Sequence, residues 1–133
     1  MQPVGVKLAL ATVAILLVAA LAPAVSAAPA PVVAKGTFGP TEKYTGKGTA
    51  TVVKVGKKRE LRLSSNFVAM NAIKLRLYLA TSPAATSRID LGPMKPTGAQ
   101  RFRLPASANL KRHKYVIAWC VSVNEPITQA VLR

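Results

Sequence analysis

The chain has 133 residues, with 19 lysine and arginine residues against four acidic residues, one histidine and one cysteine. A single cysteine excludes an intrachain disulfide, and with one histidine it cannot supply a tetrahedral zinc site. The four acidic residues are well spread along the chain, which argues against catalysis by paired carboxylates.

The first 27 residues have the order of a secretory signal peptide. Lys7 and the amino terminus precede an uncharged apolar run over residues 8–22, and Val25-Ser26-Ala27 has the small-x-small pattern of a cleavage site. The run is shorter than the ~20 apolar residues that a membrane-spanning helix needs. We therefore expect cleavage near Ala27 and export to the periplasm or the cell exterior, with membrane contact only through the signal peptide before cleavage.

The next segments predict a tether and then a β-hairpin. Residues 28–35 are rich in proline and alanine without periodicity, which favours an extended tether, and a single domain is expected over residues 36–133. Within it, Thr49–Val55 is rich in β-branched residues and Arg59–Leu63 alternates between leucine and charged residues. The Gly56–Lys58 turn between them predicts that the two runs pair as a hairpin.

Two further runs alternate with period two. Ile73–Ala80 places leucines on one face, with Tyr78 and Ala80 on the other, and Gln100–Leu104 alternates in the same way. A period of two predicts strands with one buried face and one face in water.

The run Tyr115–Val123 is apolar on both faces, which predicts a central strand, and it holds Trp119 beside Cys120. The last run, Ile127–Leu132, is short enough to pair with an edge. No convincing helical period follows the signal peptide. Six to eight short strands at this spacing predict an all-β fold, an antiparallel β-sandwich or barrel-like single domain.

The residue inventory argues against a hydrolase, and we expect no metal site and no cofactor. A Ser-His-Asp site would require His113 and Asp90 to meet beside a serine, yet His113 lies in a basic cluster that does nothing to orient it. Haem is the hardest group to exclude, because a cysteine thiolate or a methionine–histidine pair can hold its iron. The available ligands are Met70, Met94, His113 and Cys120.

The charge indicates anionic partners. Without Lys7, 18 basic residues face four acidic ones, a net charge of +14. The wet faces of the predicted strands carry Arg62, Lys74, Arg76, Arg101 and Arg103. Single-strand nucleic-acid readers also need aromatic platforms, and Tyr78 is the only aromatic residue on these faces. Export argues further against nucleic acid, so we expect an anionic envelope polymer, lipid head groups or another envelope protein.

The order of several motifs resembles the DM-thirteen domain family, an extracellular module associated with electron transfer. The resemblance runs from about Gly36 to Leu132 and is most specific in "IDLGPMKPTGAQRFRLP". Other anchors are "LRLSSNF", "LRLYLA" and "VIAWC". The resemblance implies a β-sandwich-like fold, and it implies that the family's cysteine, here Cys120, acts as a redox thiol or as a ligand for a prosthetic group.

Two functions remain open at the level of sequence. The first is an exported, non-hydrolytic binding or structural module of the cell envelope, whose basic faces engage anionic partners while Cys120 packs in the core. The alternative is a redox or electron-transfer module that uses Cys120. The two differ in whether the face formed by Val116, Ala118 and Cys120 looks onto closed core or onto a pocket.

Overall fold

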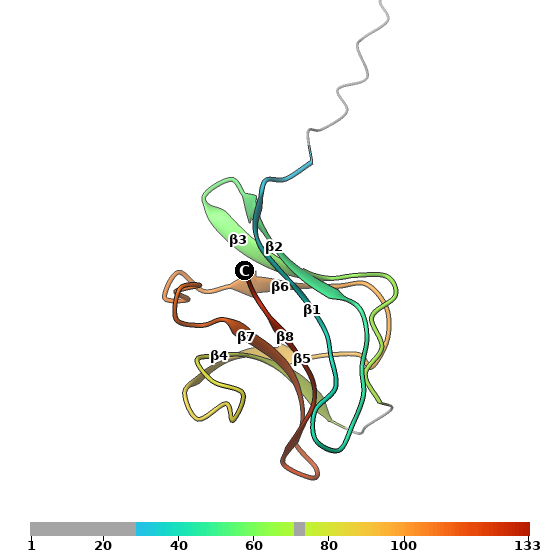
Figure 1. Ribbon diagram of the computed structural model, residues 1–133. Helices are drawn as coiled ribbons and strands as arrows, with labels where there is room; N and C mark the ends of the chain where they lie inside the picture. The colour runs from blue at the N-terminus through green and yellow to red at the C-terminus, as the bar shows by residue number, and fades with distance from the viewer. Residues whose placement is uncertain (1–28, 71–73) are drawn as a thin grey trace, which may run out of the picture.

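Eight antiparallel strands form two four-stranded sheets in the computed structural model, which describes residues 29–70 and 74–133. The strands are β1 (Val32–Thr37), β2 (Thr49–Val55), β3 (Lys58–Leu63), β4 (Leu75–Ala80), β5 (Arg88–Pro93), β6 (Gln100–Leu104), β7 (Tyr115–Cys120) and β8 (Glu125–Val131). The sheet orders are β1-β2-β3-β6 and β5-β4-β7-β8, and the sheets pack as the sandwich seen in Figure 1. The predicted all-β sandwich is confirmed.

The predicted hairpin is formed by β2 and β3. Gly56 at its turn has φ of 62°, a left-handed conformation that glycine adopts without strain. Leu61 and Leu63 are buried between the sheets, whereas Glu60 and Arg62 lie on the outer face. The run Gln100–Leu104 forms β6 at its predicted bounds and pairs with β3.

The prediction of a wet face on β4 is wrong for the second half of the strand. Tyr78 and Ala80 are only 5% and 0% exposed, because they pack in a second apolar cluster on the outer side of their sheet with Ala85, Ile117 and Trp119. Ala85 comes from the loop after β4 and covers this side. The guanidinium of Arg88 lies 4.4 Å from the centre of the Tyr78 ring, within cation–π range.

The strand β7 is central, between β4 and β8, and is buried on both faces as predicted. It ends earlier than expected, at Cys120. Val121 and Val123 lie in the turn to β8 and are 43% and 53% exposed. Asn124 ends this turn with φ of 54°, a left-handed conformation that asparagine tolerates better than most residues.

The expected tether over residues 28–35 is in part a strand. Val32–Thr37 forms β1, which pairs with β2 and also reaches across to the other sheet. The backbones of Lys35 and Arg133 exchange two hydrogen bonds of 3.0 and 2.9 Å, and the amide of Gly39 donates to the carbonyl of Gln129 at 2.9 Å. These bonds close one side of the sandwich.

The expected signal peptide, residues 1–27, lies outside the described residues, and so does Ile73 at the start of one predicted strand. Within the described ranges, no helix is long and apolar enough to cross a membrane.

Candidate functional site

Cys120 faces closed core. It is the last residue of β7, pairs with Leu75 of β4 and Glu125 of β8, and is 3% exposed. Its side chain belongs to the main apolar cluster between the sheets, together with Val116 and Ala118. The strand therefore presents its thiol to the sandwich interior and its tryptophan to the outer cluster.

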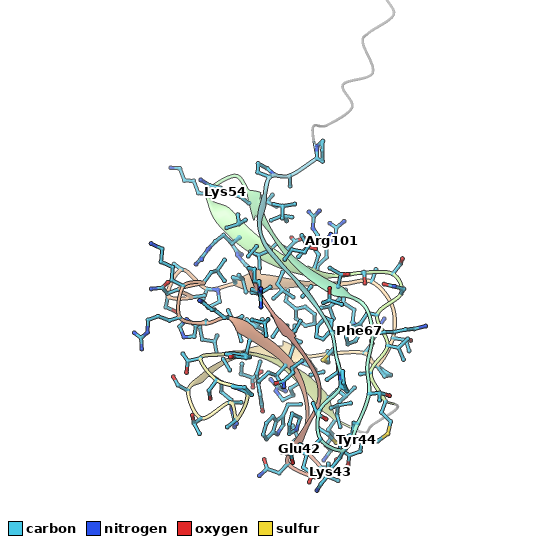
Figure 2. The ribbon with its side chains drawn as sticks, in the orientation of Figure 1. Glu42, Lys43, Tyr44, Lys54, Phe67 and Arg101 are labelled. Carbon is cyan, nitrogen blue, oxygen red and sulfur yellow. The ribbon has the colours of Figure 1, made fainter. Side chains whose placement is uncertain are left out.

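Next to Cys120, three polar side chains form a network at one end of the sandwich. The labels of Lys43 and Tyr44 mark this end in Figure 2. The Lys43 ammonium donates to Oε1 of Glu125, and the Tyr44 hydroxyl donates to Oε2 of the same carboxylate at 3.1 Å. Tyr44 also packs against the core cluster that contains Cys120. We call Lys43, Tyr44 and Glu125 the carboxylate network.

The carboxylate network shifts the proton affinity of all three groups. The hydrogen bond to Glu125 raises the pKa of Tyr44, with burial and the Glu125 charge acting in the same direction and the Cys120 thiol adding a smaller effect. The hydrogen bonds from Lys43 and Tyr44 lower the pKa of Glu125, and the hydrogen bond to Glu125 raises the pKa of Lys43. The network therefore favours the protonated phenol, the ionised carboxylate and the ionised ammonium.

A cleft of about 400 Å³ opens onto the carboxylate network. It is lined by Thr41, Glu42, Lys43, Tyr44, Pro83, Ala84, Glu125, Pro126 and Gln129. Cys120 does not line it. Because Tyr44 borders both the cleft and the core, this side chain connects the solvent-accessible space with the interior that holds the thiol.

Sequence reasoning missed the carboxylate network. Tyr44 and Glu125 are 81 positions apart, so no local periodicity links them. The one available signal was the scarcity of acidic residues. With 19 lysine and arginine residues and only four carboxylates, each carboxylate is expected to pair with a cation.

The five cations predicted to face an anionic partner do not form one surface. Arg62, Arg101 and Arg103 lie on the outer face of the sheet that contains β3 and β6, whereas Arg76 lies on β4 of the other sheet. Lys74 precedes β4 with φ of 61° and belongs to no strand. The structure distributes these residues over both sheets, because β4 belongs to the sheet opposite β3 and β6.

Acidic residues bind three of these five cations. Nε of Arg62 lies 2.8 Å from Oε1 of Glu60, and Nε of Arg101 lies 3.7 Å from the same oxygen. Nε of Arg76 lies 2.8 Å from Oδ2 of Asp90 on β5. Such exposed pairs contribute little to stability, but they lower the charge that these arginines offer to a partner.

The aromatic platform expected for nucleic-acid binding is absent from the described surface of these strands. Tyr78 lies beneath Arg88 and beside Trp119, with 5.8 Å between the ring centres of Tyr78 and Trp119. A base cannot stack on a tyrosine that is 5% exposed.

The histidine considered for hydrolysis and haem ligation lies in a different part of the sandwich from Asp90 and Cys120. His113 hydrogen-bonds to Asn109 in the loop before β7, whereas Asp90 binds Arg76 and the amide of Gly92. His113 and Cys120 lie at opposite ends of β7, roughly 20 Å apart along an extended chain. These two donors do not fit one iron or copper ion. No three His, Cys, Asp or Glu side chains gather into a metal-binding group within residues 29–70 and 74–133.

Comparison with known proteins assigns the family. The model of the family described as "Electron transfer DM13" matches residues 37–132, which covers every strand except the first five residues of β1. No curated protein and no solved structure matches the chain. The eight-stranded sandwich, with its cysteine on the central strand β7, is thus the fold of a chain that belongs to the electron transfer DM13 family.

Proposed function

We propose that this chain is an exported, non-hydrolytic electron-transfer module in which Cys120 and Tyr44 are the redox-active groups. The observation that carries the proposal is the placement of these groups in a chain of this family. The oxidisable side chains are the only tryptophan, the only cysteine and all three tyrosines. They lie on β7 or beside it, as Trp119, Cys120, Tyr115, Tyr78 and Tyr44.

Burial decides which redox chemistry suits Cys120. A thiol that is 3% exposed on a strand bonded on both sides cannot present its sulfur to the disulfide of a partner protein. Transfer of single electrons needs no contact between the partner and the sulfur. The geometry therefore favours one-electron exchange through Tyr44 over thiol–disulfide exchange.

The carboxylate network supplies a route for the proton. When a one-electron carrier oxidises Tyr44, the phenol loses an electron to the carrier and its proton to the Glu125 carboxylate across the 3.1 Å hydrogen bond. The products are a neutral tyrosyl radical, a protonated Glu125 and the reduced carrier. An electron passing from the Cys120 side chain to that radical, with return of the proton from Glu125 to the phenol and loss of the thiol proton to solvent, restores the phenol and leaves the oxidised group at sulfur.

The proposal is tested by flash photolysis of the purified chain with a photo-oxidised ruthenium complex as the one-electron acceptor. We expect a tyrosyl radical whose decay slows in Cys120→Ser and whose yield falls in Tyr44→Phe. Tyr115→Phe is the matched control, because Tyr115 lies outside the carboxylate network at the far end of β7. A radical yield and decay that are the same in all four proteins would contradict the proposal.

A second candidate function is the binding of anionic envelope partners. The observation that favours it is a group of cations without partners: Lys57, Lys58 and Arg103 are exposed and make no side-chain hydrogen bond or ion pair with the described residues. Of the five cations predicted from sequence, only Arg103 belongs to this group. Binding of this kind requires no redox chemistry, and both functions can operate in one envelope module.

A further inference from the structure

The two sides of the sandwich differ in whether the end strands of the two sheets are joined by backbone hydrogen bonds. On one side, Lys35 of β1 exchanges backbone hydrogen bonds with Arg133, just beyond β8, and Gly39, just beyond β1, bonds to Gln129 of β8. On the other side, β5 and β6 are the end strands of their sheets, and within the described residues neither has a second hydrogen-bonded strand neighbour. Unpaired strand edges offer backbone donors and acceptors to another chain.

A groove of about 490 Å³ lies where these two edges meet the β2–β3 hairpin. It is lined by Lys57, Lys58, Arg59, Asp90, Leu91, Arg103, Leu104, Pro105 and Ala106. A second hollow of about 250 Å³ shares Lys58, Arg59 and Arg103 with the first and extends along the outer face. We call the two hollows together the β5–β6 groove.

The groove combines apolar side chains with cations whose charge is not used within the protein. The guanidinium of Arg59 donates to the carbonyls of Pro105 and Ala108 at 3.3 and 2.6 Å, which fixes the wall of the groove. The carboxylate of Asp90 is engaged by Arg76. Lys57, Lys58 and Arg103 remain available to an external anion.

Charge alone would suit any polyanion, but the lining favours one class of partner. Leu91 and Pro105 offer apolar surface that a phosphate polymer cannot use. An extended peptide can place carboxylates against the cations, apolar side chains against Leu91 and Pro105, and backbone groups against an open strand edge. Alternation of acidic and apolar residues matches the alternation of a strand.

We propose that the β5–β6 groove binds an extended acidic segment of a partner protein. This inference rests on the second candidate function, binding of anionic partners, and names the partner's class and the site. It is independent of the redox chemistry at Cys120.

The test is a binding titration of the full chain, as exported and purified, with three probes. The first is a capped peptide of alternating glutamate and valine. The second is a peptide of equal length and charge with serine in place of valine, and the third is polyphosphate. We expect the glutamate–valine peptide to bind more tightly than the glutamate–serine peptide and to shift the amide NMR signals of Leu91 and Leu104.

Two variants of equal charge locate the site. Lys58→Ala/Arg103→Ala removes two cations from the groove, and we expect it to weaken binding of the glutamate–valine peptide roughly tenfold. Lys111→Ala/Arg112→Ala removes two cations from the β6–β7 loop and should change that affinity by less than about twofold. All four side chains sit outside the core, and unchanged melting temperatures would show that both variants remain folded.

Three results would overturn the inference. Equal losses in both variants, or equal affinity for the two peptides, would show that charge alone determines binding. Polyphosphate binding without peptide binding would remove the peptide assignment and leave the second candidate function intact. Absence of binding to all three probes at low salt would remove that function as well.

Discussion

At the scale of single residues, Glu125 organises the end of the sandwich beside Cys120. Its carboxylate accepts hydrogen bonds from both Lys43 and Tyr44, which lie more than 80 positions earlier in the chain. The Tyr44 phenol therefore has a proton acceptor already in place, whereas a phenol bonded only to water does not. This is the property that distinguishes Tyr44 from an ordinary surface tyrosine.

Replacement of Glu125 by glutamine is expected to lower the pKa of Tyr44 toward its ordinary value of 10.0. The hydrogen bond to the carboxylate is the largest cause of the upward shift, and glutamine removes the charge while keeping the shape. A raised pKa contributes stability that is fully present below pH 10.0 and is lost as the pH rises through the pKa of the folded protein.

Ultraviolet titration of phenolate formation measures this shift, with the Tyr44→Phe spectrum subtracted to remove the other two tyrosines. Glu42→Gln is the matched control, because Glu42 lines the same cleft but makes no hydrogen bond to Tyr44. An equal pKa of Tyr44 in the wild type and in Glu125→Gln would show that the hydrogen bond to the carboxylate does not raise this pKa.

At the scale of elements, local patterns predicted the strands well and their surroundings poorly. The β2–β3 hairpin and β6 follow from alternation and turn residues that lie within a few positions of one another. The burial of Tyr78 depends on a covering loop and on Arg88, ten positions away, which period two does not encode. Likewise, the separation of Arg76 from Arg62 depends on which sheet each strand joins.

The same limit applies to the candidate site. Cys120 could be singled out from sequence because it is unique, and the two apolar faces of β7 predicted a central strand without deciding between closed core and a pocket at the thiol. Tyr44 and Glu125 could not be, because only the folded sandwich brings their segments together. The periodicity of a sequence predicts individual strands, but it does not predict which distant segments of the sandwich lie side by side.

Closure of the sandwich depends on the absence of a side chain at Gly36. A β-carbon added there would lie 2.4 Å from the backbone carbonyl oxygen of Val131 on β8, and backbone atoms cannot rotate away. We expect Gly36→Ala to push β1 from β8 and to lower the free energy of unfolding by about 1–3 kcal/mol. Chemical denaturation measures the loss, and faster hydrogen exchange at Lys35 and Arg133 would locate it.

Gly39→Ala is the matched control for this substitution. Gly39 also bonds to β8, yet a β-carbon at this position meets nothing within 4 Å. Its unfolding free energy should stay within about 0.5 kcal/mol of the wild-type value. Equal stability of the two variants would show that the close approach of β1 to β8 does not hold the sandwich shut.

At the scale of the whole molecule, the four acidic residues lie in two places, and two of them, Glu60 and Asp90, line the β5–β6 groove. Glu42 and Glu125 lie beside the cleft at the end where β7 turns into β8, whereas Lys54 lies toward the opposite end, near the β2–β3 turn (Figure 2). The exposed Lys57 and Lys58 belong to that same turn. No described acidic side chain pairs with these two lysines, so we expect them to attract an anionic partner.

Binding of an anionic polymer should weaken steeply with salt, because each lysine or arginine that contacts the polymer releases condensed counterions. The logarithm of the association constant for polyphosphate is expected to fall linearly with the logarithm of the salt concentration. Removal of two contacting cations should reduce that slope by about 2, whether through Lys58→Ala/Arg103→Ala or through Lys111→Ala/Arg112→Ala. Both variants should thus change polyphosphate binding equally. The glutamate–valine peptide should instead lose affinity only for the variant in the groove. Affinity for polyphosphate that does not change with salt would show that the net charge of +14 outside residues 1–27 does not drive binding.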